Sequence, residues 1–371
     1  MIGSLAGLRV LDLTRLLPGG YCTLLFADHG ADVIKIEDTG AGDYARADPA
    51  SFGALNRGKR SVQLDLKSDG GRDALLRLVA SADVVIESFR PGVMDRLGVG
   101  FDVLRGVNPS LVYCAITGYG QDGPLRLRAG HDLNYLARTG VLGMSGDAGG
   151  PPVQAAAQIA DIAGGALMAA FGVLAALRSG TGQFVDISMA DGALSLLAMP
   201  AAGLLAGGAV PRRGELILGG RLLCYRVYEC ADGYVSMGAL EPKFWAAFCR
   251  GVGREDLIPS QFDAPGSAAH AEVSAVLLGR TRAEWEAFNA THDCCLEPVL
   301  ELDEVLEDEH VRSRGMVVDG LLATPVRLSE TPADYARGGP PGLGEHTDEV
   351  LGEAGYDAGE IAALRSSGAA K

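Results

Sequence analysis

The stretch GLRVLDLTRLLPGGYCTLLFADHGADVIKIE, residues 7–37, decides the fold of this chain. Residues 8–13 and 32–37 are short runs rich in aliphatic and β-branched side chains, and such runs predict strands. Between them, Pro18 and Gly19 open a helical segment that ends at Gly30. A strand, a helix and a strand in this order predict a β-α-β unit, whose strands pair in parallel through a right-handed crossover.

The same alternation continues along the first half of the chain. An amphipathic pattern predicts a helix over 69–80, and an Ala- and Gly-rich stretch predicts a long core helix over 156–178. Further strands are predicted over 61–66, 83–88, 111–118 and 183–188. Alternating strands and helices of this kind indicate a doubly wound α/β domain with a parallel sheet.

The composition changes after about residue 205. Residues 225–239 predict a hairpin that turns at Asp232-Gly233, and Thr281 with Glu284 predicts a capped helix start. The uncharged run 192–211 is broken by Pro200, so we expect a buried helix and a linker there. We therefore expect the following division: a large α/β domain over 1–200 completed by 325–371, a linker over 201–222 and a small α+β domain over 223–324.

The chain has 371 residues, with 32 Lys and Arg against 47 Asp and Glu, and a net charge of −15. Nucleic acids and anionic membranes require basic surfaces, so neither is an expected partner. The seven cysteines include no C-x-x-C pair, which argues against a zinc site or a disulfide framework. No secretory signal precedes the first predicted strand, and we expect a cytoplasmic protein.

No phosphate-binding fingerprint follows the first strand: neither G-x-G-x-x-G nor G-x-x-x-x-G-K-[ST] is present there. A basic cluster in NRGKRSVQLDLK (56–67) offers another way to hold an anionic ligand. It contains Arg57, Lys59, Arg60 and Lys67 against the single acid Asp65. The cluster is interpreted either as a site for a phosphorylated ligand or as ordinary surface charge.

Three residues are candidates for proton chemistry, each with a simpler interpretation. His131 precedes a predicted helix, and imidazole titrates near neutral pH, but a lone histidine is usually structural or exposed. Asp161 interrupts an uncharged helix, where a carboxylate must be paired, protonated or acting as the helix cap. Glu241 stands before Pro242 and is also an ordinary acid at a helix start.

Taken together, several motifs resemble the class III CoA-transferase family, and within it the α-methylacyl-CoA racemases. They run in the family's order along nearly the whole chain, and the set is specific although no single motif is. The motifs include GLRVLDLTRLLPGG (7–20), NRGKRSVQLDLKS (56–68), ESFRPGVMDRLG (87–98), GHDLNYLA (130–137) and RSGTGQFVDISMADG (178–192).

The resemblance implies an architecture and a substrate. A large α/β domain is built from both ends of the chain, a smaller domain is joined to it by long segments, and two chains interlock into an intertwined homodimer. The substrate is an acyl-CoA thioester, as in fatty acid metabolism, and CoA belongs to the substrate, so no separate cofactor or metal is implied.

The resemblance also implies a set of residues that contact CoA and the thioester. These are Leu64, Asp65, Leu66, Lys67, Ser88, Phe89, Arg90 and Arg96 in the CoA groove, and Gly130, Asp132, Leu133, Asn134 and Tyr135 along the thioester. The chain departs from the pattern at Asp38, where these racemases often carry an arginine that contacts CoA. Lys35 or the cluster at 57–60 would then have to replace that arginine. The resemblance also implies that the basic cluster over 57–67 binds the phosphates of the CoA nucleotide.

The resemblance assigns the chemistry to His131 and Asp161, which would flank the α-carbon of a 2-methyl-branched acyl-CoA. One residue removes the α-proton and the other returns a proton to the opposite face of the enolate, which inverts the centre. Glu241 of the second chain would tune His131. Transferases of the family usually carry Tyr or Phe in place of His131. The alternative activity is a CoA-transferase, in which Asp161 acts as a nucleophile and CoA moves between carboxylic acids.

Overall fold

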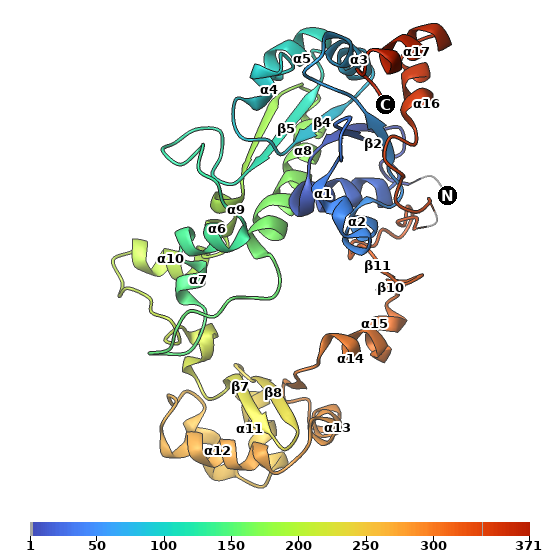
Figure 1. Cartoon of the computed structure of the whole chain (residues 1–371). Coiled ribbons are helices and arrows are strands. Elements are labelled where there is room, and N and C mark those ends of the chain that lie inside the picture. Colours follow the sequence, from blue (N-terminus) through green and yellow to red (C-terminus); the bar gives the residue numbers. More distant parts are fainter. Residues whose placement is uncertain (1–2, 336) are drawn as a thin grey trace. The chain divides into compact units, whose positions relative to one another are not determined.

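The computed structural model describes residues 3–335 and 337–371, which form two compact units (Figure 1). The first unit comprises Met1–Thr139, Ala155–Leu196 and Ser313–Lys371. The second comprises Gly140–Gln154 and Leu197–Arg312. This division differs from the expected one because Gly140–Gln154 and the expected linker pack with the second unit, and because the chain returns to the first unit at Ser313 instead of residue 325.

The first unit is built on a six-stranded sheet in the order β3-β2-β1-β4-β5-β6, with every neighbouring pair parallel. The strands are β1 (Arg9–Leu13), β2 (Asp32–Glu37), β3 (Arg60–Gln63), β4 (Val84–Glu87), β5 (Val112–Thr117) and β6 (Phe184–Ser188). The predicted doubly wound α/β fold is confirmed. The predicted strand over 61–66 is shorter in the structure: β3 ends at Gln63, and the next residue, Leu64, pairs with Ala370 near the C-terminus.

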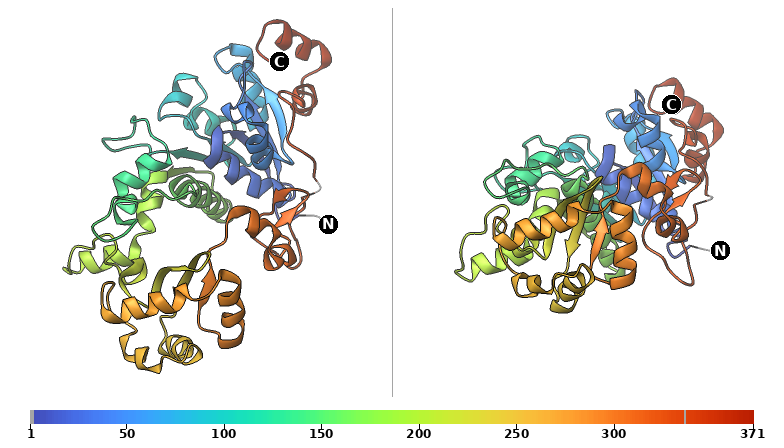
Figure 2. Two further views of the ribbon diagram at one scale, coloured as in Figure 1. Left: turned by 60° about the horizontal axis from the view of Figure 1, so that its bottom comes forward. Right: turned by 90° about the horizontal axis from the view of Figure 1, so that it is seen from below.

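Helices cover both faces of this sheet (Figure 1). On one face lie α3 (Asp69–Val79), α5 (Phe101–Val107) and α16 (Thr347–Glu353), whose Leu75, Leu104 and Val350 share a core with Leu11 and Ile34. On the other face lie α1 (Leu16–Asp28) and α8 (Leu167–Ser179), which contact each other and the sheet. The C-terminal helices α16 and α17 (Ala358–Ser366) run beside the first strands, as the red and blue segments of Figure 2 show.

The strand order creates a switch point between β1 and β4. The chain proceeds from β1 to β2 and β3 on one side, and then crosses to β4, β5 and β6 on the other. The loops that follow β1 and β4 therefore leave the sheet in opposite directions and open a crevice at its carboxyl edge, where ligands of such folds bind.

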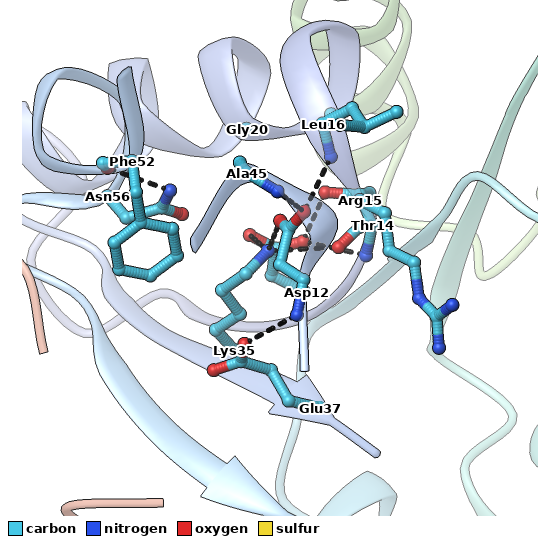
Figure 3. A network of polar contacts seen from close by, with 12 residues as sticks. Asp12, Thr14, Arg15, Leu16, Gly20, Lys35, Glu37, Ala45, Phe52 and Asn56 are labelled. Atoms are coloured by element: carbon cyan, nitrogen blue, oxygen red, sulfur yellow. Dashed lines mark hydrogen bonds and ion pairs between the residues drawn. The ribbon is translucent and has the colours of Figure 1, made fainter. Parts of the chain in front are cut away.

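A buried ion cluster lies under the loop that follows β1 (Figure 3). The side chains of Asp12, Lys35 and Lys59 have no exposed surface, and the Asp12 carboxylate lies 3.9 Å from the Lys35 Nζ and 3.3 Å from the Lys59 Nζ. Burial alone would raise the pKa of Asp12, but the two ammonium groups overcome it and lower that pKa to about 2. Burial lowers the pKa of Lys59 to about 8.

This arrangement corrects the interpretation of the basic cluster as a phosphate site. Lys59 and Lys35 are buried in ion pairs, and Arg57 is buried against Asp28 with its Nη2 2.7 Å from a carboxylate oxygen. The guanidinium of Arg60 is bound by the carboxylates of Asp32, Glu349 and Glu353. The prediction that the 57–60 cluster or Lys35 binds phosphate is wrong, because these cations are paired with carboxylates of the chain itself.

The second unit contains an antiparallel sheet of β7 (Tyr225–Cys230), β8 (Gly233–Gly238) and β9 (Leu296–Pro298). The predicted hairpin is present, and the predicted capping box of Thr281 and Glu284 is confirmed at the start of α13 (Arg282–His292). Two tryptophans, Trp245 of α11 (Pro242–Gly251) and Trp285, are fully buried and anchor its core.

Two helices carry apolar side chains that residues 3–335 and 337–371 of a single chain leave exposed. The helical stretch Ala160–Ser179 is long and apolar enough to cross a membrane, but its contacts with α1, β5 and β6 account for one of its faces. On α8 the Phe171 side chain is 72% exposed. The predicted burial of residues 192–211 is wrong for α10 (Ala198–Leu205), which has no buried residue and leaves Leu205 87% exposed.

Replacing Glu87 with glutamine tests the buried polar structure beneath the crevice. Burial raises the pKa of Glu87 to about 8, although its carboxylate accepts a hydrogen bond from the Phe89 N–H at 2.6 Å. A raised pKa contributes stability at low pH that is lost as the pH rises, here between about 4.5 and about 8. In the wild type, the unfolding free energy should fall by on the order of 1.4 kcal/mol per pH unit over this range. We expect this fall to be absent in Glu87→Gln, because glutamine does not titrate.

Urea unfolding at several pH values measures this slope. Asp102→Asn is the matched control, because Asp102 is exposed on α5 of the same unit. A Glu87→Gln slope equal to that of the wild type between pH 5 and pH 8 contradicts the assignment.

Candidate active site

A cavity of about 1180 Å³ opens in the first unit at the carboxyl edge of the sheet. Its walls come from the loops that follow β1, β4 and β5, from the segment before α6 (Asp132–Thr139), and from the first turn of the helix that carries Asp161. The cavity therefore lies at the switch point between β1 and β4, where a doubly wound sheet places its ligands.

His131 lines this cavity on a tight turn that its own neighbours build. The Asn134 side chain accepts a hydrogen bond from the His131 N–H at 3.0 Å, and the Asn134 N–H donates to the His131 carbonyl at 2.8 Å. The Tyr135 hydroxyl donates to the Gly130 carbonyl at 2.6 Å. The side chains of Asn134 and Tyr135 thus fix the backbone that carries the imidazole.

Asp161 lines the same cavity from the first turn of a π-helical segment, Ala160–Ala166. Short π-helical segments inside helices are frequent at functional sites. One oxygen of the Asp132 side chain accepts hydrogen bonds from the backbone N–H groups of Ala160 at 2.7 Å and Asp161 at 3.0 Å. Since Asp132 adjoins His131, its carboxylate ties the two candidate residues together.

The electrostatics of this pair suit proton transfer. Burial is the largest cause that raises the pKa of Asp161 to about 6, and the negative charge of Asp132 adds to it, while His131 acts in the opposite direction. Both protonation states of Asp161 are therefore populated near neutral pH. A group in this condition can accept a proton or donate one.

Glycine allows the Asp161 helix to approach its neighbour α9 (Met189–Ser195) closely. A Cβ atom at Gly164 would lie 2.6 Å from the Met189 carbonyl oxygen, and one at Gly192 would lie 2.1 Å from the Gly164 carbonyl oxygen. Only hydrogen fits at both positions, so the two backbones pack directly against each other. This contact holds the Asp161 helix against α9.

The cavity carries a positive lining in a chain with a strongly negative total charge. Among the described residues that line it, four are arginines, Arg15, Arg90, Arg126 and Arg128, and two are carboxylates, Asp48 and Asp161. Sequence reasoning found only Arg90. Arg15 follows β1 just as Arg90 follows β4, so the same argument from strand ends could have found it. Arg126 and Arg128 lie a few residues before His131, and their proximity to that motif was the available signal.

The structure places some of the predicted contact residues at the cavity and others elsewhere. Those that line it are Ser88, Phe89, Arg90, Gly130, Asn134 and Tyr135. Leu64 is buried in the core and Leu66 packs against it. The Asp65 side chain accepts a hydrogen bond from the Lys67 N–H at 3.0 Å. Three further residues are exposed and do not belong to the described cavity lining: Lys67, Arg96 and Leu133. The role of Asp132 is to connect Ala160 and Asp161, as described above.

Glu241 lies in the second unit, directly before α11. Its backbone carbonyl accepts the Phe244 N–H at 3.0 Å, while its side chain makes no capping hydrogen bond and is exposed. The carboxylate is therefore not used in starting the helix. In residues 3–335 and 337–371, no three His, Cys, Asp or Glu side chains gather as metal ligands would.

Replacing Asp132 with asparagine separates its charge from its hydrogen bonds. The asparagine oxygen still accepts the two backbone N–H groups, whereas the negative charge near Asp161 is lost. We expect the pKa of Asp161 to fall below about 6, by up to about one unit. Carbon-13 labelling of the aspartate carboxyl groups, with Asp161→Asn to assign the signal, measures the titration midpoint.

Asp122→Asn is the control for this titration, because Asp122 is an exposed acid of the same unit that does not line the cavity. It should leave the midpoint of Asp161 in place. A midpoint in Asp132→Asn that is unchanged or higher would show that Asp132 acts on Asp161 through geometry alone.

Comparison with known proteins gives a family match over most of the chain. The sequence profile described as CoA-transferase family III matches residues 5–347. An α-methylacyl-CoA racemase of Mus musculus is 39% identical, in an alignment that covers 98% of this chain and 96% of the relative. A succinyl-CoA:mesaconate CoA-transferase of Haloarcula hispanica is 35% identical, with 96% of this chain and 98% of the relative covered.

Solved structures agree with this match. A CAIB/BAIF family protein from Brucella suis superimposes with a TM-score of 0.84 and 30% sequence identity, covering 95% of this chain and all of that one. Relatives of both activities, racemase and CoA-transferase, are thus similar in sequence to this chain over nearly its full length.

Proposed function

Because the chain belongs to CoA-transferase family III, whose members act on acyl-CoA substrates, we propose that it is an acyl-CoA racemase that inverts the α-carbon of 2-methyl-branched thioesters. The observation that carries the proposal is the pairing of His131 with Asp161 at one cavity, joined through the Asp132 side chain. An imidazole and a carboxyl group of raised pKa form the acid and base that such a reaction requires.

The reaction proceeds by removal and return of one proton. One member of the pair takes the α-proton, the C–H electron pair moves into the C–C bond, and the thioester carbonyl becomes an enolate oxygen. The other member then gives its proton to the opposite face of the α-carbon. The positive end of the α6 dipole, which lies at His131, favours the negative charge on the enolate oxygen. The two residues exchange roles for the other enantiomer.

The lining of the cavity matches the two chemically different ends of an acyl-CoA. Arginine side chains suit the phosphates of the nucleotide. Apolar side chains from the first turn of α1 and from α9, including Leu16, Leu17 and Met189, suit the acyl chain. CoA is part of the substrate, and the proposed reaction uses no other cofactor.

A CoA-transferase is the second candidate, and transferases among the relatives support it. In that reaction the Asp161 carboxylate attacks the thioester carbonyl and expels the CoA thiolate, which leaves an acyl group on the aspartate. The position of His131 beside Asp161 favours the racemase, since a nucleophilic carboxylate alone does not require a second base.

Replacing His131 with alanine tests the proposed chemistry. We expect exchange of the α-proton of a 2-methylacyl-CoA with D₂O, without an acceptor acid, to slow by about 10²–10⁴-fold, because one of the two bases is lost. Proton NMR follows the exchange. His310→Ala, which removes an exposed histidine of α15 (Glu309–Ser313), is the control.

Two outcomes oppose the racemase. His131→Ala with the exchange rate of the wild type removes His131 from the mechanism. An acyl-aspartate adduct at Asp161, trapped by mass spectrometry together with transfer to an added carboxylic acid, would instead establish the transferase.

We also propose that the functional unit is an intertwined homodimer in which the second unit of one chain completes the site of the other. Phe171 and Leu174 of α8 and Leu205 of α10 are exposed apolar side chains on helices. Such faces are typical of surfaces that a partner covers. The Glu241 carboxylate, which does not cap its own helix, would then approach His131 of the second chain.

Co-expression of His131→Ala chains with Glu241→Ala chains tests the shared site. We expect both pure variants to be weak, with Glu241→Ala the milder because it acts through His131. The hybrid should regain activity, since one of its two sites carries both native residues. Light scattering gives the mass, and an active monomer, or hybrids no more active than their parents, contradicts the proposal.

A further inference from the structure

We infer that Arg15 binds a phosphate group of the CoA nucleotide and that a buried ion network builds its position. The inference rests on the proposed acyl-CoA substrate, and it names a residue that neither the motif comparison nor the family match assigned. Arg15 lines the cavity directly after β1, as the residue that precedes α1. At this place a guanidinium and the N-terminus of a helix both favour an anion.

The backbone on both sides of Arg15 is held by buried charges. The Lys35 Nζ donates to the Thr14 carbonyl at 2.9 Å and lies 2.9 Å from the Asp43 carboxylate. The other Asp43 oxygen accepts the Leu16 N–H at 2.9 Å. Leu16 adopts a φ of +63°, a conformation that costs energy in a residue with a Cβ atom. The network thus imposes a specific turn at Arg15, and Figure 3 shows the Arg15 side chain pointing away from it.

The Arg15 guanidinium is held in place by two hydrogen bonds and has further N–H donors available. Its Nη2 donates to the Asp38 carboxylate at 2.8 Å and its Nη1 donates to the Tyr44 hydroxyl at 3.1 Å. Its central carbon lies 5.0 Å from the centre of the Tyr44 ring and 5.7 Å from that of Phe89, and both rings line the cavity. A guanidinium has five N–H donors, so in the described structure three remain for a ligand.

The Asp38 carboxylate orients the Arg15 side chain at the cavity. The Asp38 side chain is 43% exposed and lies outside the described cavity lining, whereas that of Arg15 is 29% exposed and belongs to it. The guanidinium therefore lies at the rim of the cavity, where a phosphate can reach it. The carboxylate holds the long side chain of Arg15 in one orientation before a ligand binds. Preorganisation of this kind lowers the entropic cost of binding.

The first test uses Arg15→Gln, with binding of free CoA measured by calorimetry and KM measured for an acyl-CoA. We expect the Kd of free CoA and the KM of the acyl-CoA each to rise by about ten- to a hundredfold, because charge-assisted hydrogen bonds are lost. The kcat should change little. Arg105→Gln, which removes an exposed arginine of α5 outside the cavity lining, should change neither constant.

Truncated thioesters identify the phosphate. The KM of an acyl-pantetheine, which lacks the nucleotide, should be the same in the wild type and Arg15→Gln. If the effect disappears with the thioester of dephospho-CoA, Arg15 binds the 3′-phosphate, and if it persists, Arg15 binds the pyrophosphate. An equal effect on acyl-pantetheine, or no effect on CoA binding, overturns the inference.

A second variant distinguishes the loss of a phosphate contact from misfolding of Arg15→Gln. Adding Asp38→Arg to Arg15→Gln places a new guanidinium beside the lost one, and it should restore at least part of the CoA affinity. A double variant that folds, as judged by circular dichroism, and binds CoA no better than Arg15→Gln alone counts against a phosphate at this rim. A wild type that binds CoA but exchanges no α-proton would reject the racemase and leave the role of Arg15 intact.

Discussion

The buried ammonium group of Lys35 is the constraint on which the rest of the structure depends. A charge without exposed surface is tolerated only where opposite charges and hydrogen bonds compensate its lost hydration. Burial would lower the pKa of Lys35, but the carboxylates of Asp12 and Asp43 overcome this, and its pKa is raised. Because the same ammonium binds the Thr14 carbonyl, the interaction that compensates the charge also shapes the loop that forms the cavity wall.

The pairing of buried charges also decides where basic side chains remain available for a ligand. Most basic residues near the first three strands are bound by carboxylates inside the first unit, as Arg57 is by Asp28 and Arg46 by Glu37. The arginines that remain for a ligand lie on loops at the carboxyl edge of the sheet. A chain with a net charge of −15 can thus present a positive cavity, since local pairing and not the total charge decides the sign at a site.

The proposed chemistry depends on close approach between two segments that are distant in the sequence. The Asp132 carboxylate joins the turn of His131 to the first turn of the Asp161 helix, and Gly164 with Gly192 lets that helix pack directly on α9. Burial at this junction raises the pKa of Asp161 into the range where it exchanges protons near neutral pH. The close packing of these segments therefore both positions Asp161 and raises its pKa.

The sequence alone determined the features that depend on local patterns. Residues 32–37 were predicted as a strand with the observed limits, the capping box of Thr281 was found from its spacing, and the motif around His131 indicated a site because its residues are neighbours in the chain. Only the tertiary structure decided which cations are structural and which face a ligand. Lys59 lies 47 residues from Asp12, so its burial and pairing leave no local signal, and the sequence pattern alone predicts a phosphate site there. The position of Arg15 at the end of β1 could have been found from the sequence, but the orientation of its side chain depends on Asp38 and Tyr44, which the fold brings to it from the far end of β2.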